Sequence, residues 1–456
     1  MREFNDQAET RAVLGSGFNF RPYHAYSYSY PHKSAYGPLE PVVDLRELWQ
    51  TEERGSLFLY VHIPFCEMRC GFCNLFTRVG GEHLHERYLD TLERQLDVMA
   101  DSTEGERSFS RLAIGGGTPT VLDVGQLDRL FTMLRDRLGV DVYSARAAVE
   151  TSPKTSTRDR LALLRDCGVH RVSIGVQSFV DAEVQSIGRP QQAIEAHSAI
   201  RRIRDVGIPC LNVDLIYGQP GQTLASWMYS LETALEYEPE ELFLYPLYVR
   251  PNTGIAGKTS RGGDDHLRQC YESAREHLLK CGYEQFSMRC FTKAAPQTSM
   301  PNDSEATSGF SCQEDGMLGL GCGARSYTSN VHYSSPFAVQ KTVLAGILDS
   351  WINQRESDFK IASWGIRLDE EERRRRFAIQ SLLNRTGLDR HAFSTRFGVE
   401  PHLAIPELDA LASWSYLEED GDVLRLNPEG MGLSDAIGPF LYSAKSRARL
   451  EEFTRV

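Results

Sequence analysis

The order in which apolar segments recur constrains the fold of this chain most strongly. From residue 57 to about residue 245, short apolar or β-branched runs alternate with amphipathic stretches of helical length. This alternation is typical of β-α units, which build a parallel sheet flanked by helices. The expected strands span residues 57–63, 111–114, 146–150, 171–175, 211–217 and 241–245. The expected helices span residues 88–99, 124–138, 157–167, 193–206 and 223–235. The sequence therefore predicts an α/β fold.

Polar residues occur at successive strand exits, where β-α folds gather their catalytic groups. Parallel strands joined by right-handed crossovers all end on one side of the sheet, so the residues after them share one rim. Glu150, Gln177, Arg189 and Asp214 belong to this set. Each one alone is readily explained as a buried cap or a surface ion pair. All four at one rim indicate a ligand site, because a carboxylate can accept ribose hydroxyls and an arginine can hold a carboxylate.

A glycine-rich segment, Ile114-Gly-Gly-Gly-Thr-Pro, follows the second expected strand. Glycines permit positive φ and a close backbone approach, so the amides of this segment are expected to meet the polar end of a ligand. The segment lacks the Gly-Lys-Ser/Thr of a phosphate-binding loop and the spacing of a dinucleotide fingerprint. Nucleotide binding of either kind is therefore not expected.

The charge balance narrows the classes of partner. The chain has 62 acidic and 50 basic residues, a formal charge of -12, which disfavours broad attraction to nucleic acid or to anionic lipid. Its longest apolar runs, such as residues 57–63, are far shorter than the ~20 residues that span a bilayer. The first residues show no apolar segment behind a basic start, so no secretory signal is expected. We expect a cytoplasmic protein with a small-molecule substrate and neither nucleic acid nor membrane as a partner.

Three of the ten cysteines, Cys66, Cys70 and Cys73, lie within eight residues, directly after the first expected strand. Their thiolates can converge on one centre, but the next cysteine is Cys167, so no fourth thiolate is close in sequence to complete a structural zinc site or an ordinary iron-sulfur cluster. One metal position is left open, which suits an iron atom that binds a small chelating cofactor. A three-cysteine zinc site or a chance grouping is the alternative.

The spacing resembles the CxxxCxxC signature of radical S-adenosylmethionine (SAM) enzymes. The flanking residues, Tyr60-Val-His-Ile-Pro-Phe-Cys66 and Cys70-Gly-Phe-Cys73, are similar to the oxygen-independent coproporphyrinogen III oxidase-like (HemN-like) branch. The resemblance implies a partial (β/α)6 radical SAM barrel and a 4Fe-4S cluster held by these three cysteines. SAM would chelate the fourth iron, and reduction would cleave it to methionine and a 5'-deoxyadenosyl radical. A flavodoxin or ferredoxin is the implied electron donor.

The family binds two SAM molecules, and the resemblance implies which residues of this chain occupy the matching binding positions. The positions implied for the first SAM are Tyr60, Gly116 and Glu150. The positions implied for the second SAM are Phe72, Gly117, Thr118, Gln177, Arg189 and Asp214.

The resemblance runs from about residue 60 to residue 327 and resumes in a small C-terminal α/β lobe. The expected domains are an aromatic-rich N-terminal arm (1–56), the radical SAM partial barrel (57–290), a linker and pocket-completing segment (291–368) and a C-terminal HemN-like domain (369–456). The last begins with acidic and then basic residues that suit a helix dipole, and this charge run is expected to face solvent.

One departure separates this chain from the coproporphyrinogen oxidases, which carry a further cysteine two positions after the third cluster ligand. Leu75 stands there instead. Branches without that cysteine include haem chaperones, haem-degrading radical methyltransferases and class C radical SAM methyltransferases.

Retention of both SAM site sets favours a class C enzyme. The predicted reaction is therefore C-methylation or methylene transfer, with cyclopropanation as one outcome, at an sp2 carbon of an aromatic or conjugated natural product. Whether a partner methyltransferase-like enzyme completes the reaction stays open. The alternatives are a coproporphyrinogen III dehydrogenase-like or haem-degrading enzyme, and a haem chaperone.

A few further side chains each allow a functional and a structural interpretation. His24, His32 and His332 are candidate haem ligands under the chaperone alternative, although lone histidines are more often ordinary polar residues. Cys312 and Cys322 are candidate radical quenchers or covalent handles, with buried packing as the simpler explanation. His62 is expected to pack or to form a hydrogen bond.

Overall fold

The computed structural model describes residues 22–23, 29–258, 261–294 and 316–455, and these residues form two compact units. The larger unit comprises residues 36–285 and 289–369. The smaller unit comprises residues up to 35, residues 286–288 and residues from 370 onward.

Six parallel strands in sequence order form the centre of the larger unit. They are β2 (Leu57–Ile63), β5 (Phe109–Gly116), β6 (Ala148–Thr151), β7 (Arg171–Gln177), β8 (Cys210–Tyr217) and β9 (Glu241–Pro246). Each pairs in parallel with the next. The predicted α/β fold with its parallel core is confirmed.

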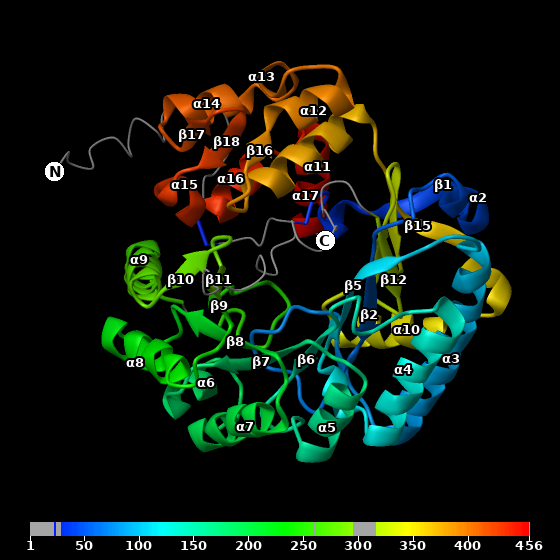
Figure 1. Ribbon diagram of the computed structural model, residues 1–456, viewed down its shortest axis with the longest axis horizontal. Helices are drawn as coiled ribbons and strands as arrows, with labels where there is room; N and C mark the ends of the chain where they lie inside the picture. Colours follow the sequence, from blue (N-terminus) through cyan, green and yellow to red (C-terminus); the bar gives the residue numbers. More distant parts are fainter. Residues whose placement is uncertain (1–21, 24–28, 259–260, 295–315, 456) are drawn as a thin grey trace. The chain divides into compact units, whose positions relative to one another are not determined.

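Helices cover the outer side of these strands, as Figure 1 shows. They are α3 (Glu82–Ser102), α4 (Val124–Leu138), α5 (Arg158–Asp166), α6 (Asp181–Ser186), α7 (Ala193–Val206), α8 (Leu224–Leu235) and α9 (Asp264–Lys280). The bounds of α4 follow from local signals. Asp123 and Gln126 form a reciprocal capping box at its start, and Gly139 ends it in the left-handed conformation with φ 68°.

Short strands extend the sheet at both edges beyond the predicted core. On the β2 side the order is β1 (Gly37–Asp44), β15 (Ile361–Arg367), β14 (Val331–Ser334), β13 (Arg325–Tyr327) and β12 (Met317–Leu320). On the β9 side, β11 (Cys290–Lys293) and β10 (Tyr283–Gln285) follow in antiparallel pairs. Two further helices are α2 (Leu45–Gln50) and α10 (Lys341–Ile352). Most of these strands are too short to produce a period in the sequence, so pattern reasoning missed them.

Residues 37–50 differ from the extended arm that the sequence suggested, because they form β1 and α2. Pro38 and Pro41 interrupt the apolar alternation of β1, and its register against β15 shifts between Pro38 and Val43. Because proline lacks an amide donor, such a strand is found at a sheet edge, and β1 is an edge strand here.

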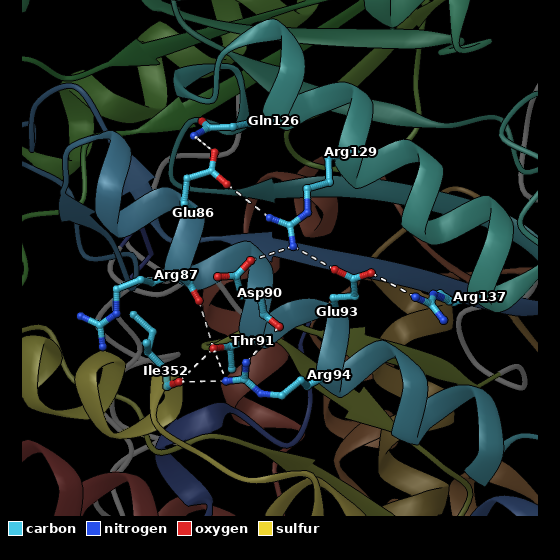
Figure 2. A network of polar contacts seen from close by, with 10 residues as sticks. All are labelled: Glu86, Arg87, Asp90, Thr91, Glu93, Arg94, Gln126, Arg129, Arg137 and Ile352. Carbon is cyan, nitrogen blue, oxygen red and sulfur yellow. Dashed lines mark hydrogen bonds and ion pairs between the residues drawn. The ribbon is translucent and has the colours of Figure 1, made fainter.

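Charged side chains connect α3 and α4 on the outside of the barrel (Figure 2). Arg129 of α4 forms ion pairs with Glu86 at 3.3 Å, Asp90 at 2.8 Å and Glu93 at 2.8 Å, all from α3. Arg137 forms a second ion pair with Glu93, at 3.1 Å. These hydrogen bonds lower the pKa of Glu93. Isolated surface ion pairs contribute little to stability, whereas several charges joined in one network, as here, contribute more.

The smaller unit packs helices around a short sheet. Its helices are α11 (Glu370–Leu382), α12 (Arg390–Phe397), α13 (Pro401–Ala404), α14 (Glu407–Ser413), α15 (Pro428–Gly432), α16 (Ser434–Phe440) and α17 (Ala444–Arg455). The sheet order is β16 (Leu388–Asp389), β18 (Val423–Leu426) and β17 (Leu417–Asp420). Tyr30, from the N-terminal segment, is part of its core.

The charge run that begins α11 is not simply solvated, and this prediction is wrong for two of its residues. Glu372 is 1% exposed and accepts hydrogen bonds from the hydroxyls of Tyr30 and Ser443. Arg375 is buried and pairs with Glu407 at 3.1 Å. Their burial depends on segments distant in sequence, so the helix pattern alone does not reveal it. Within the described part of the chain, no helix is both long and apolar enough to cross a membrane.

Candidate functional site

One cavity of the larger unit opens at the carboxyl ends of the parallel strands and gathers most of the residues that the sequence singled out. The predicted residues in its lining are Cys66, Cys70, Phe72, Cys73, Gly116, Gly117, Thr118, Glu150, Gln177, Arg189 and Asp214. Tyr60 is outside this lining. Its hydroxyl lies 3.2 Å from Nδ1 of the buried His62, so the predicted hydrogen-bonding role of His62 agrees with the geometry.

Backbone contacts fix the cysteine loop on both sides. At its two ends, β3 (Phe65–Cys66) pairs in parallel with β4 (Arg78–Val79). In the middle, the amide of Gly71 donates to the carbonyl of Gly188 at 3.1 Å. A Cβ at Gly71 would lie 2.7 Å from the carbonyl oxygen of Ile187, so only glycine allows this approach. The loop is therefore a packed part of the barrel.

The three thiols supply the ligand type that holds an iron-sulfur cluster. All three line the same cavity and are half-buried. Within the described part of the chain, however, no three His, Cys, Asp or Glu side chains come together closely enough to hold one metal ion. Three cysteine ligands in one cavity would leave one iron of a four-iron cluster for another ligand.

Burial controls the protonation of these thiols. It raises the pKa of the Cys66 thiol to about 12, while a hydrogen bond from Thr118 acts in the opposite direction. It also raises the pKa of Cys73. Because iron binds the thiolate, loading the site must release these protons.

The glycine-rich segment serves the protein's own packing. Gly116 donates its amide to Oε2 of Glu150 at 3.1 Å, and Gly117 donates its amide to the carbonyl of Ile63 at 2.8 Å. A Cβ at Gly117 would lie 2.3 Å from the carbonyl oxygen of Phe65. The expectation that these amides meet a ligand therefore differs from the structure, in which they already have protein acceptors. Gly117 is needed because β5 and the cysteine loop approach each other so closely, and a Cβ at Gly116 would lie 2.5 Å from the ring of His62.

Two carboxylates lie deep in the cavity. Burial and the neighbouring charge of Asp214 raise the pKa of Glu150 to about 7, although its side chain is exposed to the cavity. Burial also raises the pKa of Asp214 to about 6, against a hydrogen bond from Asn212 at 2.8 Å. Loss of solvation of the charged form is the main cause of both shifts, and the charge of Asp214 adds to the shift of Glu150. Both groups have acceptor oxygens for ligand hydroxyls.

Arg189 is held in a fixed orientation beside the cysteine loop. Its Nη2 donates to the carbonyl of Gly175 at 2.7 Å, and its Nε donates to the side-chain oxygen of Gln191 at 2.7 Å. Gln177, at the end of β7, has a positive φ of 71°, at the point where the register against β8 shifts. This strained backbone lies at the cavity wall, where function commonly retains strain.

The cavity also contains residues that sequence reasoning did not select. Thr77, Lys154, Ser173 and Gln191 belong to its lining. Lys154 follows β6, so its position at a strand exit was an available signal. Thr77 carried none, because only the pairing of β3 with β4 returns it to the cysteines.

The remaining single-residue candidates among the described residues are not part of the cavity lining. His332 is fully buried against Tyr327, with ring centroids 4.4 Å apart, and Nδ1 of His32 lies 2.6 Å from the Ser34 hydroxyl. Cys322 is fully buried, and burial raises the pKa of its thiol to about 12, as packing predicts. His24 and Cys312 lie outside the described residues.

Known proteins with similar sequences share a radical SAM barrel with this chain. Residues 60–234 match the Radical SAM superfamily. The Heme chaperone HemW of Escherichia coli (strain K12) is 31% identical over 277 residues, which cover 59% of this chain and 69% of that protein. The oxygen-independent coproporphyrinogen III oxidase of Salmonella typhimurium (strain LT2) is 28% identical over 460 residues, which cover 94% of this chain and 96% of that protein.

A solved structure supports the same relationship. The coproporphyrinogen III oxidase (HemN) from Escherichia coli, described as a radical SAM enzyme, superposes with a TM-score of 0.75 at 25% identity. The match covers 91% of this chain and 96% of that one. The radical SAM family uses a 4Fe-4S cluster and SAM, as the sequence predicted.

These relatives overturn the predicted reaction. C-methylation or methylene transfer to a natural product, with cyclopropanation, was wrong, because the relatives with substantial matches are coproporphyrinogen III oxidases and heme chaperones. The class C methyltransferase assignment fails with it. Its basis was the retention of the expected SAM-binding positions, and positions that hold a cofactor do not identify the substrate.

Proposed function

Because this chain belongs to the HemN-like family of radical SAM proteins, we propose that it oxidises a carboxylate-bearing tetrapyrrole of the coproporphyrinogen type. The observation that carries the proposal is the nearly end-to-end match to coproporphyrinogen III oxidases, which extends beyond the barrel at both ends. The boundaries of the four domains expected from the sequence remain predictions.

The cluster and SAM supply, when bound, a radical that abstracts hydrogen. Cys66, Cys70 and Cys73 would hold three irons as thiolates. Glu150 offers carboxylate oxygens to ribose hydroxyls, and the oriented guanidinium of Arg189 offers donors to a carboxylate. A count of two SAM molecules, and the division of the binding residues between them, are part of this proposal.

The proposed reaction converts a propionate side chain into a vinyl group. The chain –CH2–CH2–COO⁻ loses one hydrogen atom, then carbon dioxide and one electron, which passes to a one-electron acceptor. The charge and the atoms balance in this form. The protein must therefore hold the carboxylate and expose to the radical the CH2 attached to the ring, which is one carbon further away than the CH2 that carries the carboxylate.

Two side chains at the cavity suit such a substrate. Lys154 is exposed at the exit of β6, where its ammonium can pair with a propionate carboxylate. Leu75, which stands where the family's oxidases have a cysteine, is 46% exposed and lines the same cavity. It offers apolar contact to a flat ring and no thiol, so the proposed reaction does not involve a thiol at this position.

Anaerobic incubation of reconstituted enzyme with SAM, dithionite and coproporphyrinogen III tests the proposal. We expect 5'-deoxyadenosine, carbon dioxide and a product with a vinyl group, and none of these from Cys70→Ser. Formation of 5'-deoxyadenosine at the same rate with and without the tetrapyrrole, without carbon dioxide, would contradict it.

A heme chaperone is the second candidate, because the Heme chaperone HemW of Escherichia coli is 31% identical over 277 residues. The same preparation separates the two functions. Stoichiometric heme binding with a Soret band, together with no SAM cleavage under reducing conditions, would favour the chaperone. An electron donor of the flavodoxin or ferredoxin class remains a proposal under either function.

A further inference from the structure

Each cluster cysteine has at least one polar side chain near its sulfur. All three neighbours line the cavity that contains the thiols. The pairs are Thr118 Oγ1 with Cys66 Sγ at 3.6 Å, Arg189 Nη1 with Cys70 Sγ at 3.6 Å, and Thr77 Oγ1 with Cys73 Sγ at 3.9 Å. A thiolate has no proton, so each neighbour must be the donor once iron is bound.

The backbone places Thr118 beside Cys66. The amide of Thr118 donates to the carbonyl of Phe65 at 2.7 Å, one residue before the cysteine. Gly117 permits this contact because it has no Cβ to meet Phe65. The position of the hydroxyl follows from the junction of β5 with the cysteine loop and does not require a flexible side chain to reach across the cavity.

Thr77 is brought back to the loop in a comparable way. The amide of Arg78 donates to the carbonyl of Pro64 at 2.7 Å, and β3 pairs with β4 immediately beyond. Thr77 itself is 2% exposed. Its hydroxyl therefore has little competition from water.

Arg189 reaches Cys70 from a third segment. The Gly71–Gly188 backbone bond joins the residues next to Cys70 and Arg189. The guanidinium is oriented by its bonds to Gly175 and Gln191. Three separate backbone segments thus each place one donor side chain beside the cluster sulfurs.

We propose that Thr77, Thr118 and Arg189 act as positioning residues that raise the reduction potential of the iron-sulfur cluster. Reduction adds one negative charge, which is shared by the cluster and its thiolates. Donors aimed at the thiolate sulfurs stabilise that charge, and hydrogen bonds to sulfur are one of the factors that set cluster potentials. The inference concerns the cluster alone and does not depend on which substrate is oxidised.

Redox titration of the reconstituted protein, followed by electron paramagnetic resonance, tests this role. We expect Thr118→Val and Thr77→Val each to shift the midpoint potential to a more negative value and the double variant to shift it further. Thr118→Ser and Thr77→Ser retain the hydroxyl and are expected to keep a value close to that of the wild type. Iron and sulfide content, measured on the same samples, separates a changed potential from a lost cluster.

Thr120→Val is the matched control. Thr120 is buried two residues from Thr118, and its hydroxyl contacts Thr151 and Thr155 at 2.7 Å, so its loss should leave the potential unchanged. Equal potentials for the valine variants, the serine variants and the wild type at full cluster occupancy would overturn the proposal.

A second measurement requires no variant. Pulsed electron-nuclear double resonance of the reduced wild-type cluster in D2O should detect exchangeable deuterons coupled to the cluster. Their absence would overturn the proposal even if the valine variants failed to assemble a cluster.

Discussion

Gly71 donates its backbone amide to the carbonyl oxygen of Gly188 at 3.1 Å, and this bond joins the cysteine loop to the segment that carries Arg189. The two glycines are in contact, because a Cβ at Gly188 would lie 2.9 Å from the Cα of Gly71. The geometry of the cluster site therefore depends on a contact between residues that are far apart in sequence.

Gly71→Val should displace the cysteine loop. The new side chain would begin 2.7 Å from the carbonyl oxygen of Ile187, and overpacking of this kind costs about 1–3 kcal/mol. We expect lower iron content after reconstitution and a lower melting temperature. Gly55→Val is the control, because nothing lies within 4 Å of a Cβ at that position. Equal iron content in both variants would show that the contact is not needed.

Glu150→Gln should change how the stability of the metal-free protein depends on pH. Burial raises the folded-state pKa of Glu150 from 4.5 to about 7. The folded state therefore binds its proton more tightly, and this contribution is complete below about pH 4.5 and is lost as pH rises through 7. Thermal unfolding at pH 5 and pH 8 should show a smaller loss of stability in the variant than in the wild type.

The control for Glu150→Gln is Glu67→Gln, an exposed carboxylate at the same cavity. It should keep the wild-type difference between the two pH values. Weaker SAM binding by Glu150→Gln, measured by calorimetry on the cluster-loaded protein, is expected in addition, because one acceptor for ribose hydroxyls is weakened.

Tyr30→Phe should destabilise the smaller unit. The Tyr30 hydroxyl donates to the buried carboxylate of Glu372, and Ser443 donates to the other carboxylate oxygen at 2.6 Å. Removing one donor from a buried charged group costs about 1–3 kcal/mol. Urea unfolding monitored for this unit should show that decrease, whereas Tyr143→Phe, at a 79% exposed position, should have no effect.

Lys154→Met should weaken substrate binding if the proposed function holds. Loss of a hydrogen bond to a charged group, about 1.5–3 kcal/mol, corresponds to a roughly 10- to 100-fold rise in KM. Lys154→Arg keeps the positive charge and should recover most of the affinity. SAM cleavage in the absence of tetrapyrrole should be unchanged in both variants, and an unchanged KM in Lys154→Met would exclude this residue from substrate recognition.

Local sequence patterns predicted the parallel core and the cysteine loop accurately. The helices 124–138 and 193–206 match α4 and α7 at both ends, because caps and apolar period act over a few neighbouring residues. Cys66, Cys70 and Cys73 line one cavity, because a short loop after a strand leaves them no other place. The predicted ligand residues also share that cavity, apart from Tyr60, because parallel strands end at one rim.

Tertiary structure decided the features that depend on contacts between residues far apart in sequence. The burial of Glu372 depends on Tyr30, which is 342 residues away in sequence. The pattern of charges in α11 therefore could not predict that Glu372 is buried. The amides of Gly116 and Gly117 have protein acceptors because β5 lies between β2, which carries Ile63, and β6, which carries Glu150. The donors to the thiolates come from three separate segments. The substrate was the hardest feature to predict from the sequence. Discrimination between substrates depends on the shape and charge of a cavity, and that cavity exists only in the folded protein.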